Sequence, residues 1–313
     1  MGYETAAVET ARNDLQVELL KIIRSYCPSD GLHPSPVPGV YCLKFSKTEQ
    51  PAKRRWRACL GLVIQGGKKI VLGREIYRLE AGHYTATPVE LPVVSSVVAA
   101  SPGKPFLALL IDLDPPLLTE VSAQIDGETP KESDKALRAV FVGKANDVML
   151  AAAVRLAKLF QNPDDAPVLR PLIVKEILYH LLKGPEGAAI RKFVRSGSKM
   201  HKISRAIHAL ASEFSKEADL PALAKTANMS RSAFFKYFKE VAAMSPIQYR
   251  KRLRLHEARR LMIEQGETAE ASAFKVGYNS ASQFSREYSR MFGDSPLRDA
   301  VKVKEAGNLV RQM

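Results

Sequence analysis

The chain has 313 residues, a formal net charge of +14 and a pI near 9.6, so a polyanion is the first partner to consider, with nucleic acid ahead of a membrane surface. Its length predicts two domains, while no apolar run reaches the roughly 18 residues that a membrane-spanning helix needs. The three cysteines, Cys27, Cys42 and Cys59, are an odd number without Cys-x-x-Cys spacing, so we expect a cytoplasmic protein without disulfide framework or zinc site.

Residues 1–33 are expected to begin with an amphipathic helix, because Leu15, Leu19, Ile22 and Tyr26 recur at helical spacing before Pro28. Residues 34–125 change to short β-branched and aromatic runs that Gly and Pro separate. Closely spaced short strands of this kind indicate an antiparallel sandwich or barrel.

Helical periodicity returns in residues 126–199, from about Asp134, with Leu, Ile and Val every three or four positions in 148–160 and 168–182. These helices are expected to pack beside the barrel or to pair two subunits into a homodimer. Residues 200–300 are expected to form a second, all-helical domain, followed by a tail at 301–313. The stretch 199–313 also holds 21 Lys and Arg against 12 Asp and Glu, which concentrates the basic excess there.

An internal repeat lies in this second domain, where two segments match at an offset of fifty positions. The matched pairs are Ser230 with Ser280, Ser232 with Ser282, Phe234 with Phe284, Lys236 with Arg286, Phe238 with Tyr288, Val241 with Met291, Ser245 with Ser295 and Pro246 with Pro296. In each copy the first Ser is suited to cap a helix, and the residues four, eight and eleven positions later form an apolar stripe.

Each copy follows a short helical stretch with a small residue, Ala224 in the first and Ala273 in the second. A small side chain lets two helices cross closely, and Gly277 eases the second turn, which is one residue longer than the first. Both copies are therefore expected to be helix-turn-helix units. A connecting helix from Pro246 to Gln265 would be about 30 Å long, close to the roughly 34 Å turn of B-DNA, and could place both recognition helices in successive major-groove segments.

The segment 203–298 resembles the DNA-binding domain of the AraC/XylS family of bacterial regulators. The resemblance is carried by residues 229–239, 245–249, 254–262, 276–278 and 282–296, which read MSRSAFFKYFK, SPIQY, RLHEARRLM, VGY and SQFSREYSRMFGDSP. Upstream, HPS at 33–35, IQGGKK at 64–69, LPV at 91–93 and ASP at 100–102 are similar to the N-terminal sensory domain of one AraC-type subgroup.

The resemblance implies an α+β protein: a cupin-like β-barrel or sandwich at 34–125 with flanking helices, and an all-α domain with two helix-turn-helix units joined by a long helix. It also implies a transcription regulator of double-stranded promoter DNA, most commonly an activator that recruits RNA polymerase and responds to a small-molecule effector. Two residues depart from the family pattern. Ala243 stands where Gly is usual, and Ser272 takes a usually apolar position, so the first helix of the second unit is expected to pack less firmly.

By position, the resemblance makes the outward residues of the two recognition helices the base readers. They are Arg231, Ser232, Phe235 and Lys236 in the first helix and Ser282, Gln283, Ser285 and Arg286 in the second. Lys236 could donate to guanine, Gln283 could read adenine and Phe235 could contact a thymine methyl. For Arg286 the alternative is an ion pair with a neighbouring helix.

A second set is expected to contact phosphates, which supplies affinity without sequence information. It comprises Ser230, Lys239, Ser245, Arg250, Arg252, Arg254, Ser280 and Arg290. Lys251, Arg259 and Arg260 belong to the same basic stretch. Because a helix points its residues in several directions, we expect fewer than half of the basic residues to touch DNA.

In the first domain the effector-pocket candidates are aromatic or His side chains, for which ordinary core or rim positions are the alternative. They are Tyr41, Trp56, Tyr77, His83 and Tyr84. Cys42 or Cys59 could sense electrophiles, or could be buried and inert.

Two other functional classes remain as alternatives. A cupin enzyme would need a His-x-His metal motif, which His83-Tyr84-Thr85 lacks, and the six histidines are scattered, so we expect no metal, cofactor or catalytic residue. A DNA-compacting or RNA-binding module would rely on stacking, against which stand the two defined recognition helices and an aromatic content of 7%.

Overall fold

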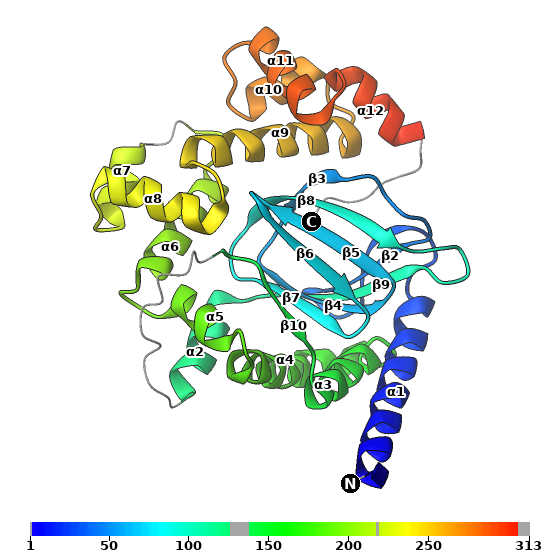
Figure 1. Ribbon diagram of the computed structural model, residues 1–313. Coiled ribbons are helices and arrows are strands. Elements are labelled where there is room, and N and C mark those ends of the chain that lie inside the picture. Colours follow the sequence, from blue (N-terminus) through cyan, green and yellow to red (C-terminus); the bar gives the residue numbers. More distant parts are fainter. Residues whose placement is uncertain (1, 126–137, 217–218, 306–313) are drawn as a thin grey trace.

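The structure is a computed structural model that describes residues 2–125, 138–216 and 219–305 (Figure 1). The expected helix start near Asp134 and the tail beyond residue 305 lie outside the described residues. A β-sandwich occupies the first part of the chain, helices lie along it, and the last third is helical. No helix within the described ranges combines the length and the apolar character that crossing a membrane requires.

Within those ranges, ten strands form two antiparallel sheets. The first sheet has the order β1-β2-β9-β4-β7-β10, with β1 at Gly31–Pro34, β2 at Val40–Phe45, β4 at Cys59–Gln65, β7 at His83–Thr87, β9 at Phe106–Asp112 and β10 at Phe141–Lys144. The second has the order β3-β8-β5-β6, with β3 at Ala52–Trp56, β5 at Gly67–Leu72, β6 at Glu75–Glu80 and β8 at Leu91–Ala99. The predicted sandwich is thereby confirmed.

The core of the sandwich lies between the two sheets. In β5 the residues at positions 68, 70 and 72 are buried and those between them are half-buried, which is the alternation of a strand with one inner and one outer face. The central strands β4 and β9 are buried along nearly their whole lengths, because helices cover the outer face of their sheet.

The helices before residue 200 are α1 (Gly2–Ser25), α2 (Pro115–Gln124), α3 (Asp147–Lys158), α4 (Ala166–Lys183) and α5 (Gly187–Val194), with α6 (Lys199–Ser212) across the expected boundary. As predicted, α1 ends just before Pro28, and Leu19 and Ile22 are buried in the core. It packs on β4 and β9 and beside α3, which in turn packs on α4 (Figure 1).

The C-terminal helices are α7 (Leu220–Thr226), α8 (Arg231–Ala242), α9 (Pro246–Glu264), α10 (Ala269–Lys275), α11 (Ala281–Phe292) and α12 (Pro296–Glu305). The long helix α9 lies across β3 and β8 of the second sheet, with α10, α11 and α12 beyond it (Figure 1). One hydrophobic cluster of buried residues runs from Leu19 to Leu253, and a second is confined to residues 255–300. The first helix-turn-helix unit therefore shares its core with the sandwich, whereas the second has a core of its own.

Candidate DNA-binding surface and effector cleft

The two helix-turn-helix units are built from matching parts. Ser230 caps α8 by accepting a hydrogen bond from the backbone N of Ala233, and Ser280 caps α11 by accepting one from Gln283, both at 3.3 Å. Such caps satisfy donors that the first helical turn leaves free. The apolar stripe of α8 is buried, as its spacing predicts. In α11 Phe284 and Tyr288 are buried and Met291 is half-buried.

The turns inside the two units both contain a residue with a positive φ, but the residue differs. Four positions after Ala224 and after Ala273 the backbone takes a positive φ, at Asn228 (φ 49°) and at Gly277 (φ 88°). Asn tolerates this left-handed region, while Gly277 is required for a second reason. A Cβ there would come within 2.0 Å of the carbonyl oxygen of Ser215.

The two recognition helices end in the same backbone conformation but with different residues, as the departure of Ala243 from the family pattern suggests. Gly293 ends α11 in the left-handed conformation, and Ala243, fifty positions earlier, adopts the same conformation at φ 58°. A side chain in this region is strained, so Ala243 costs about 1 kcal/mol relative to Gly. At the other departure, the Ser272 hydroxyl is buried in the second core without a hydrogen-bond partner among the described residues.

The predicted base readers lie on the outward faces of α8 and α11. Phe235 and Ser285 are half-buried, whereas the other six are exposed: Arg231, Ser232, Lys236, Ser282, Gln283 and Arg286. The guanidinium of Arg231 stands 5.9 Å from the ring centre of Phe235. In the part of the chain that the structure describes, neither Lys236 nor Arg286 has an ion-pair partner, so the alternative for Arg286 finds no support.

The predicted phosphate residues separate into two groups. Lys239, Arg290 and the capping residues Ser230 and Ser280 are exposed, and Ser245 caps α9 through a reciprocal capping box with Gln248. Lys239 and Arg290 lie in the last turns of α8 and α11, and the three Ser residues stand at helix N-termini.

Three arginines of the set are turned toward the protein. The guanidinium of Arg254 donates to the carbonyl oxygens of Phe214, Ser215, Lys216 and Gly277, and thus ties the segment before α7 to the second turn. Arg250 donates to the carbonyl oxygen of Lys216, and burial of Arg252 lowers its pKa. The carbonyl partners leave the guanidinium of Arg254 engaged within the protein, and the half-buried Arg252 has less of its side chain available to a phosphate.

The neighbouring basic residues of α9 and the second unit form internal ion pairs. Lys251 contacts Glu287 at 2.7 Å, and Arg260 contacts Glu257 at 2.6 Å. Arg259 binds Asp299 with two hydrogen bonds of 2.7 and 3.0 Å. Much of the positive charge of this helix is therefore compensated within the domain.

The five effector candidates lie on four different strands of the sandwich, β2, β3, β6 and β7. Trp56 and Tyr84 are buried in the sandwich core, and His83 contacts the backbone of Glu80. The hydroxyl of Tyr41 donates to Asp112 at 3.3 Å, and that of Tyr77 donates to Glu75. The core and rim alternative thus describes their positions, and their role in effector binding stays a prediction.

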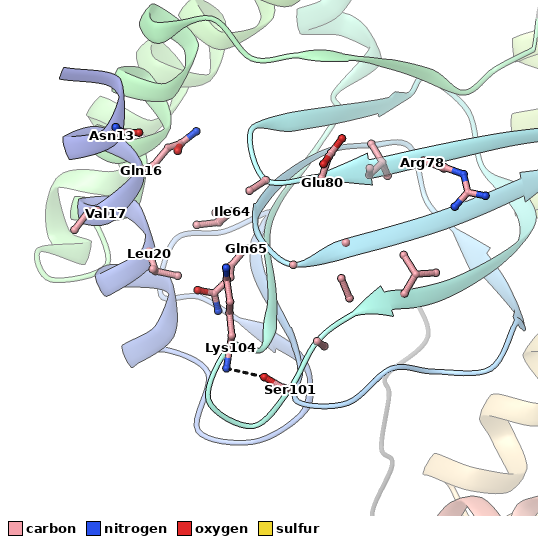
Figure 2. Close-up of a pocket in the computed structure, with 17 residues that line it drawn as sticks. Asn13, Gln16, Val17, Leu20, Ile64, Gln65, Arg78, Glu80, Ser101 and Lys104 are labelled. Atoms are coloured by element: carbon pink, nitrogen blue, oxygen red, sulfur yellow. Dashed lines mark hydrogen bonds between the residues drawn. The ribbon is translucent and has the colours of Figure 1, made fainter. Parts of the chain in front are cut away.

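A different cleft, of about 870 Å³, opens where α1 crosses one end of the sandwich (Figure 2). It is lined by residues of α1 and by the ends of β4, β6 and β8, among them Gln16, Val17, Leu20, Ile64, Gln65, Arg78, Leu79, Glu80, Ser101 and Lys104. Apolar side chains alternate with amides and charged groups along its wall. Gly66 and Gly67 of the IQGGKK segment also line this cleft, which no motif in the sequence predicted as a ligand site.

Sequence reasoning missed the contacts between the domains. Arg55 of β3 binds Glu90 at 2.5 Å and approaches Glu257 of α9 at 3.6 Å, while the hydroxyl of Tyr249 donates to the carbonyl oxygen of Glu90 at 3.0 Å. Burial, the largest single effect, lowers the pKa of Arg55, but the hydrogen bond and charge of Glu90, with smaller contributions from Tyr249 and Glu257, together outweigh it and raise the pKa. The available signal was the run Lys53-Arg54-Arg55, because consecutive cations are unusual in a strand.

Comparisons with known proteins agree with this architecture. Residues 36–189 match the family described as AraC-type transcriptional regulator N-terminus, and residues 223–299 match a helix-turn-helix domain family. The transcriptional regulator ExsA of Pseudomonas aeruginosa is 25% identical over 150 residues, which cover 48% of this chain and 54% of that protein. The probable regulator LumQ of Photobacterium leiognathi is 32% identical over 83 residues, which cover 26% of this chain and 34% of that protein.

The chain thus spans between a third and about half of the length of these curated relatives. Among solved structures, ToxT of Vibrio cholerae has a TM-score of 0.55 at 12% identity over 84% of this chain and 96% of its own. At this identity the likeness concerns the fold, in which a sandwich domain and two helix-turn-helix units occur together.

Proposed function

Because this chain belongs to the AraC-type family of transcriptional regulators, we propose that it binds a bipartite DNA site, with α8 and α11 of one chain in two successive major-groove segments. The observation that carries the proposal is the pair of matching, exposed faces on α8 and α11, joined by the single helix α9. At 19 residues α9 is about 28 Å long, which is close to the spacing of major-groove segments along one side of B-DNA.

We expect Lys236→Ala and Arg286→Ala each to weaken specific binding by roughly 1 to 3 kcal/mol and to relax the preference at particular bases, because each removes a donor to a base edge. Binding to operator DNA and to random DNA is measured by fluorescence anisotropy at matched salt. The control is Lys183→Ala, which removes the same charge from an exposed position of α4, on the far side of the sandwich. Equal losses on both DNAs for both variants would contradict the assignment to base reading.

The phosphate contacts that we propose are the exposed side chains of Lys239 and Arg290 and the helix N-termini at Ser230, Ser245 and Ser280. Removing any of them should lower the affinity for all DNA sequences alike, and it should reduce the salt dependence of binding. Arg252 and Arg254 are left out, because burial of Arg252 lowers its pKa and the guanidinium of Arg254 donates to backbone carbonyls.

We further propose that two chains associate through α4. Its outer face exposes Val168, Leu169, Leu172 and Tyr179, which is a run of apolar side chains along one helix. Covering such a face would remove apolar area from water. A dimer would place four recognition helices on one promoter, where recruitment of RNA polymerase is the activating step that we propose.

The small-molecule site that we propose is the cleft between α1 and the end of the sandwich (Figure 2). Structures of ToxT were solved with an unsaturated fatty acid and with (E)-4-(8-methylnaphthalen-1-yl)but-3-enoic acid, which are organic acids with apolar bodies. The cleft offers apolar side chains next to the cations Arg78 and Lys104, which suit a ligand of that general character.

A thermal-shift screen of the full chain against a library of small organic acids, sugars and amines tests the cleft. Ligands that bind there should raise Tm by a few degrees in the wild type and lose this effect in Val17→Arg, because the new side chain fills the cleft. Val148→Arg is the matched control, since Val148 is exposed to the same 48% as Val17 but lies on α3 outside the cleft. A ligand whose shift survives Val17→Arg binds elsewhere.

A further inference from the structure

The C-terminal ends of both recognition helices are held by groups of the N-terminal domain. The last four carbonyl oxygens of a helix have no partner within it, and they carry the negative end of the helix dipole. At the end of α11 the ammonium of Lys53, on β3, donates to the carbonyl oxygen of Met291 at 2.5 Å. At the end of α8 the guanidinium of Arg138 donates to the carbonyl oxygens of Lys239, at 3.1 Å, and of Glu240.

The two cations are themselves fixed to the sandwich. Arg138 forms an ion pair of 3.0 Å with Glu75 on β6, and the backbone N of its neighbour Ala139 donates to the carbonyl oxygen of Val241 on α8. Lys53 is in register with Val94 in the ladder between β3 and β8. Lys53 on the second sheet thus caps α11, and Arg138, which lies before β10 and is bound to Glu75 of the second sheet, caps α8. Helix α9 lies across the same sheet (Figure 1).

The C-terminal ends that Arg138 and Lys53 bind are not the ends that carry the predicted base readers. Ser232 and Lys236 lie in the first two turns of α8, and Ser282 and Arg286 lie in the first two turns of α11. All four remain exposed while the domains are in contact. The docked arrangement therefore leaves both faces open to a duplex, so that the contact positions the helices and does not cover them.

The two recognition helices differ in the other contacts that fix them to the N-terminal domain. The first unit shares a continuous hydrophobic core with the sandwich, so α8 is fixed by packing as well as by Arg138. The second unit has its own core, and its placement relative to the sheet depends on α9 and on the contact between Lys53 and Met291. The hydrogen bond of Lys53 therefore joins the sheet directly to the end of α11.

We propose that the N-terminal domain sets the spacing between the two DNA segments that one chain accepts, with Lys53 and Arg138 as positioning residues at the ends of α11 and α8. The inference rests on the proposed function, since it requires that both helices read one duplex. A fixed separation between the helices penalises any duplex in which the two segments are one base pair nearer or farther apart. Releasing the end of α11 lets the second unit follow such a duplex at lower cost.

The test is a selection from a duplex library in which two randomised segments are separated by spacers of stepwise different length. The full-length wild type should retain one spacer length over its neighbours. In Lys53→Met this preference should fall about tenfold, because a hydrogen bond from a charged group typically contributes at least that factor to an equilibrium. Lys53→Arg should restore it, while the control Lys47→Met, which removes an exposed cation from the loop before β3, should leave it unchanged.

A distance measurement without DNA gives an independent readout. Nitroxide labels at Ser232→Cys and Ser282→Cys, both exposed, report the separation of the helices by electron–electron resonance, and the natural cysteines are buried and so protected from labelling. Lys53→Met should broaden the distance distribution, and Arg138→Met should broaden it less. A narrow distribution and an unchanged spacer preference in Lys53→Met would overturn the inference. If the wild type itself retains no sequence in either segment, it is the proposed function that fails.

Discussion

Replacing Asp299 by alanine is expected to lower the free energy of unfolding of the second helix-turn-helix unit by about 3 kcal/mol, because it leaves a largely buried cation without its partner. The carboxylate of Asp299 accepts two hydrogen bonds from Arg259 and a third, of 2.6 Å, from the hydroxyl of Tyr288. Burial, the largest single effect, lowers the pKa of Arg259, but the hydrogen bonds and negative charge of Asp299, with a smaller contribution from Tyr288, together outweigh it and raise the pKa. Without Asp299 the burial cost of Arg259 remains and its compensation is gone.

The measurement is urea unfolding followed by circular dichroism, together with binding to a duplex that carries only the segment read by α11. Glu270→Ala is the matched control, since it removes an exposed carboxylate from α10 of the same unit. Because the second unit has a separate core, its transition should come earlier in Asp299→Ala while that of the sandwich stays in place. Equal midpoints for the two variants would show that the ion pair contributes little.

The internal repeat allowed most of the DNA-binding domain to be predicted from the sequence. An offset of fifty positions, a capping Ser and an apolar stripe define each recognition helix locally, and these features need no knowledge of the rest of the fold. The position of the first turn is also determined by local sequence. Its positive φ falls on Asn228, whose small polar side chain tolerates that conformation.

The asymmetry between the units was visible in part. The longer second turn and Ser272 can be read from the sequence. The exchange of an aromatic contact in the first unit for a hydrogen-bonded ion pair in the second cannot. In the first unit Phe238 packs edge-on against Tyr249 at 5.5 Å, whereas the residues fifty positions later, Tyr288 and Asp299, share a hydrogen bond. The partner Arg259 comes from α9, so the group is recognisable only once the helices are placed.

The effector site and the domain interface could not be predicted for a related reason. Aromatic residues such as Trp56 and Tyr84 are suited to a pocket and to a core alike, and the side of the strand they occupy depends on which sheet covers them. The residues of the interface, Arg55, Glu90 and Glu257, are far apart in the sequence and meet only because α9 lies on the second sheet. Local patterns carry no information about such long-range packing.

A second large effect is expected at Lys68, whose side chain projects from β5 into the core of the sandwich. Its ammonium stands 4.8 Å from the ring centre of Trp56 and 5.8 Å from that of Phe106. Within the described part of the chain it has no carboxylate partner, because Glu49 is bound by Arg54 with both oxygens. Burial, with a further contribution from the nearby Arg54, lowers the pKa of Lys68 to about 7.

The sign of the pH dependence follows from this shift. In the unfolded chain Lys68 has the ordinary pKa of 10.5, so between pH 7 and 10.5 the unfolded state binds more protons and stability rises with pH. Below pH 7 the cost of the buried charge is present in full. Attraction to the two rings offsets part of it, which leaves a penalty of about 2 to 4 kcal/mol.

Lys68→Met should therefore stabilise the sandwich by that amount at pH 6, and the gain should vanish toward pH 10.5, since methionine fills a similar volume without a charge. Lys69→Met, one position along the strand and on its outer face, is the matched control and should change stability little at either pH. Because Trp56 is the single tryptophan of the chain, its fluorescence should also titrate near pH 7 in the wild type and lose this step in Lys68→Met. A loss of stability at pH 6 in Lys68→Met would mean that the ammonium is stabilised in place, and that its two aromatic neighbours more than compensate for its burial.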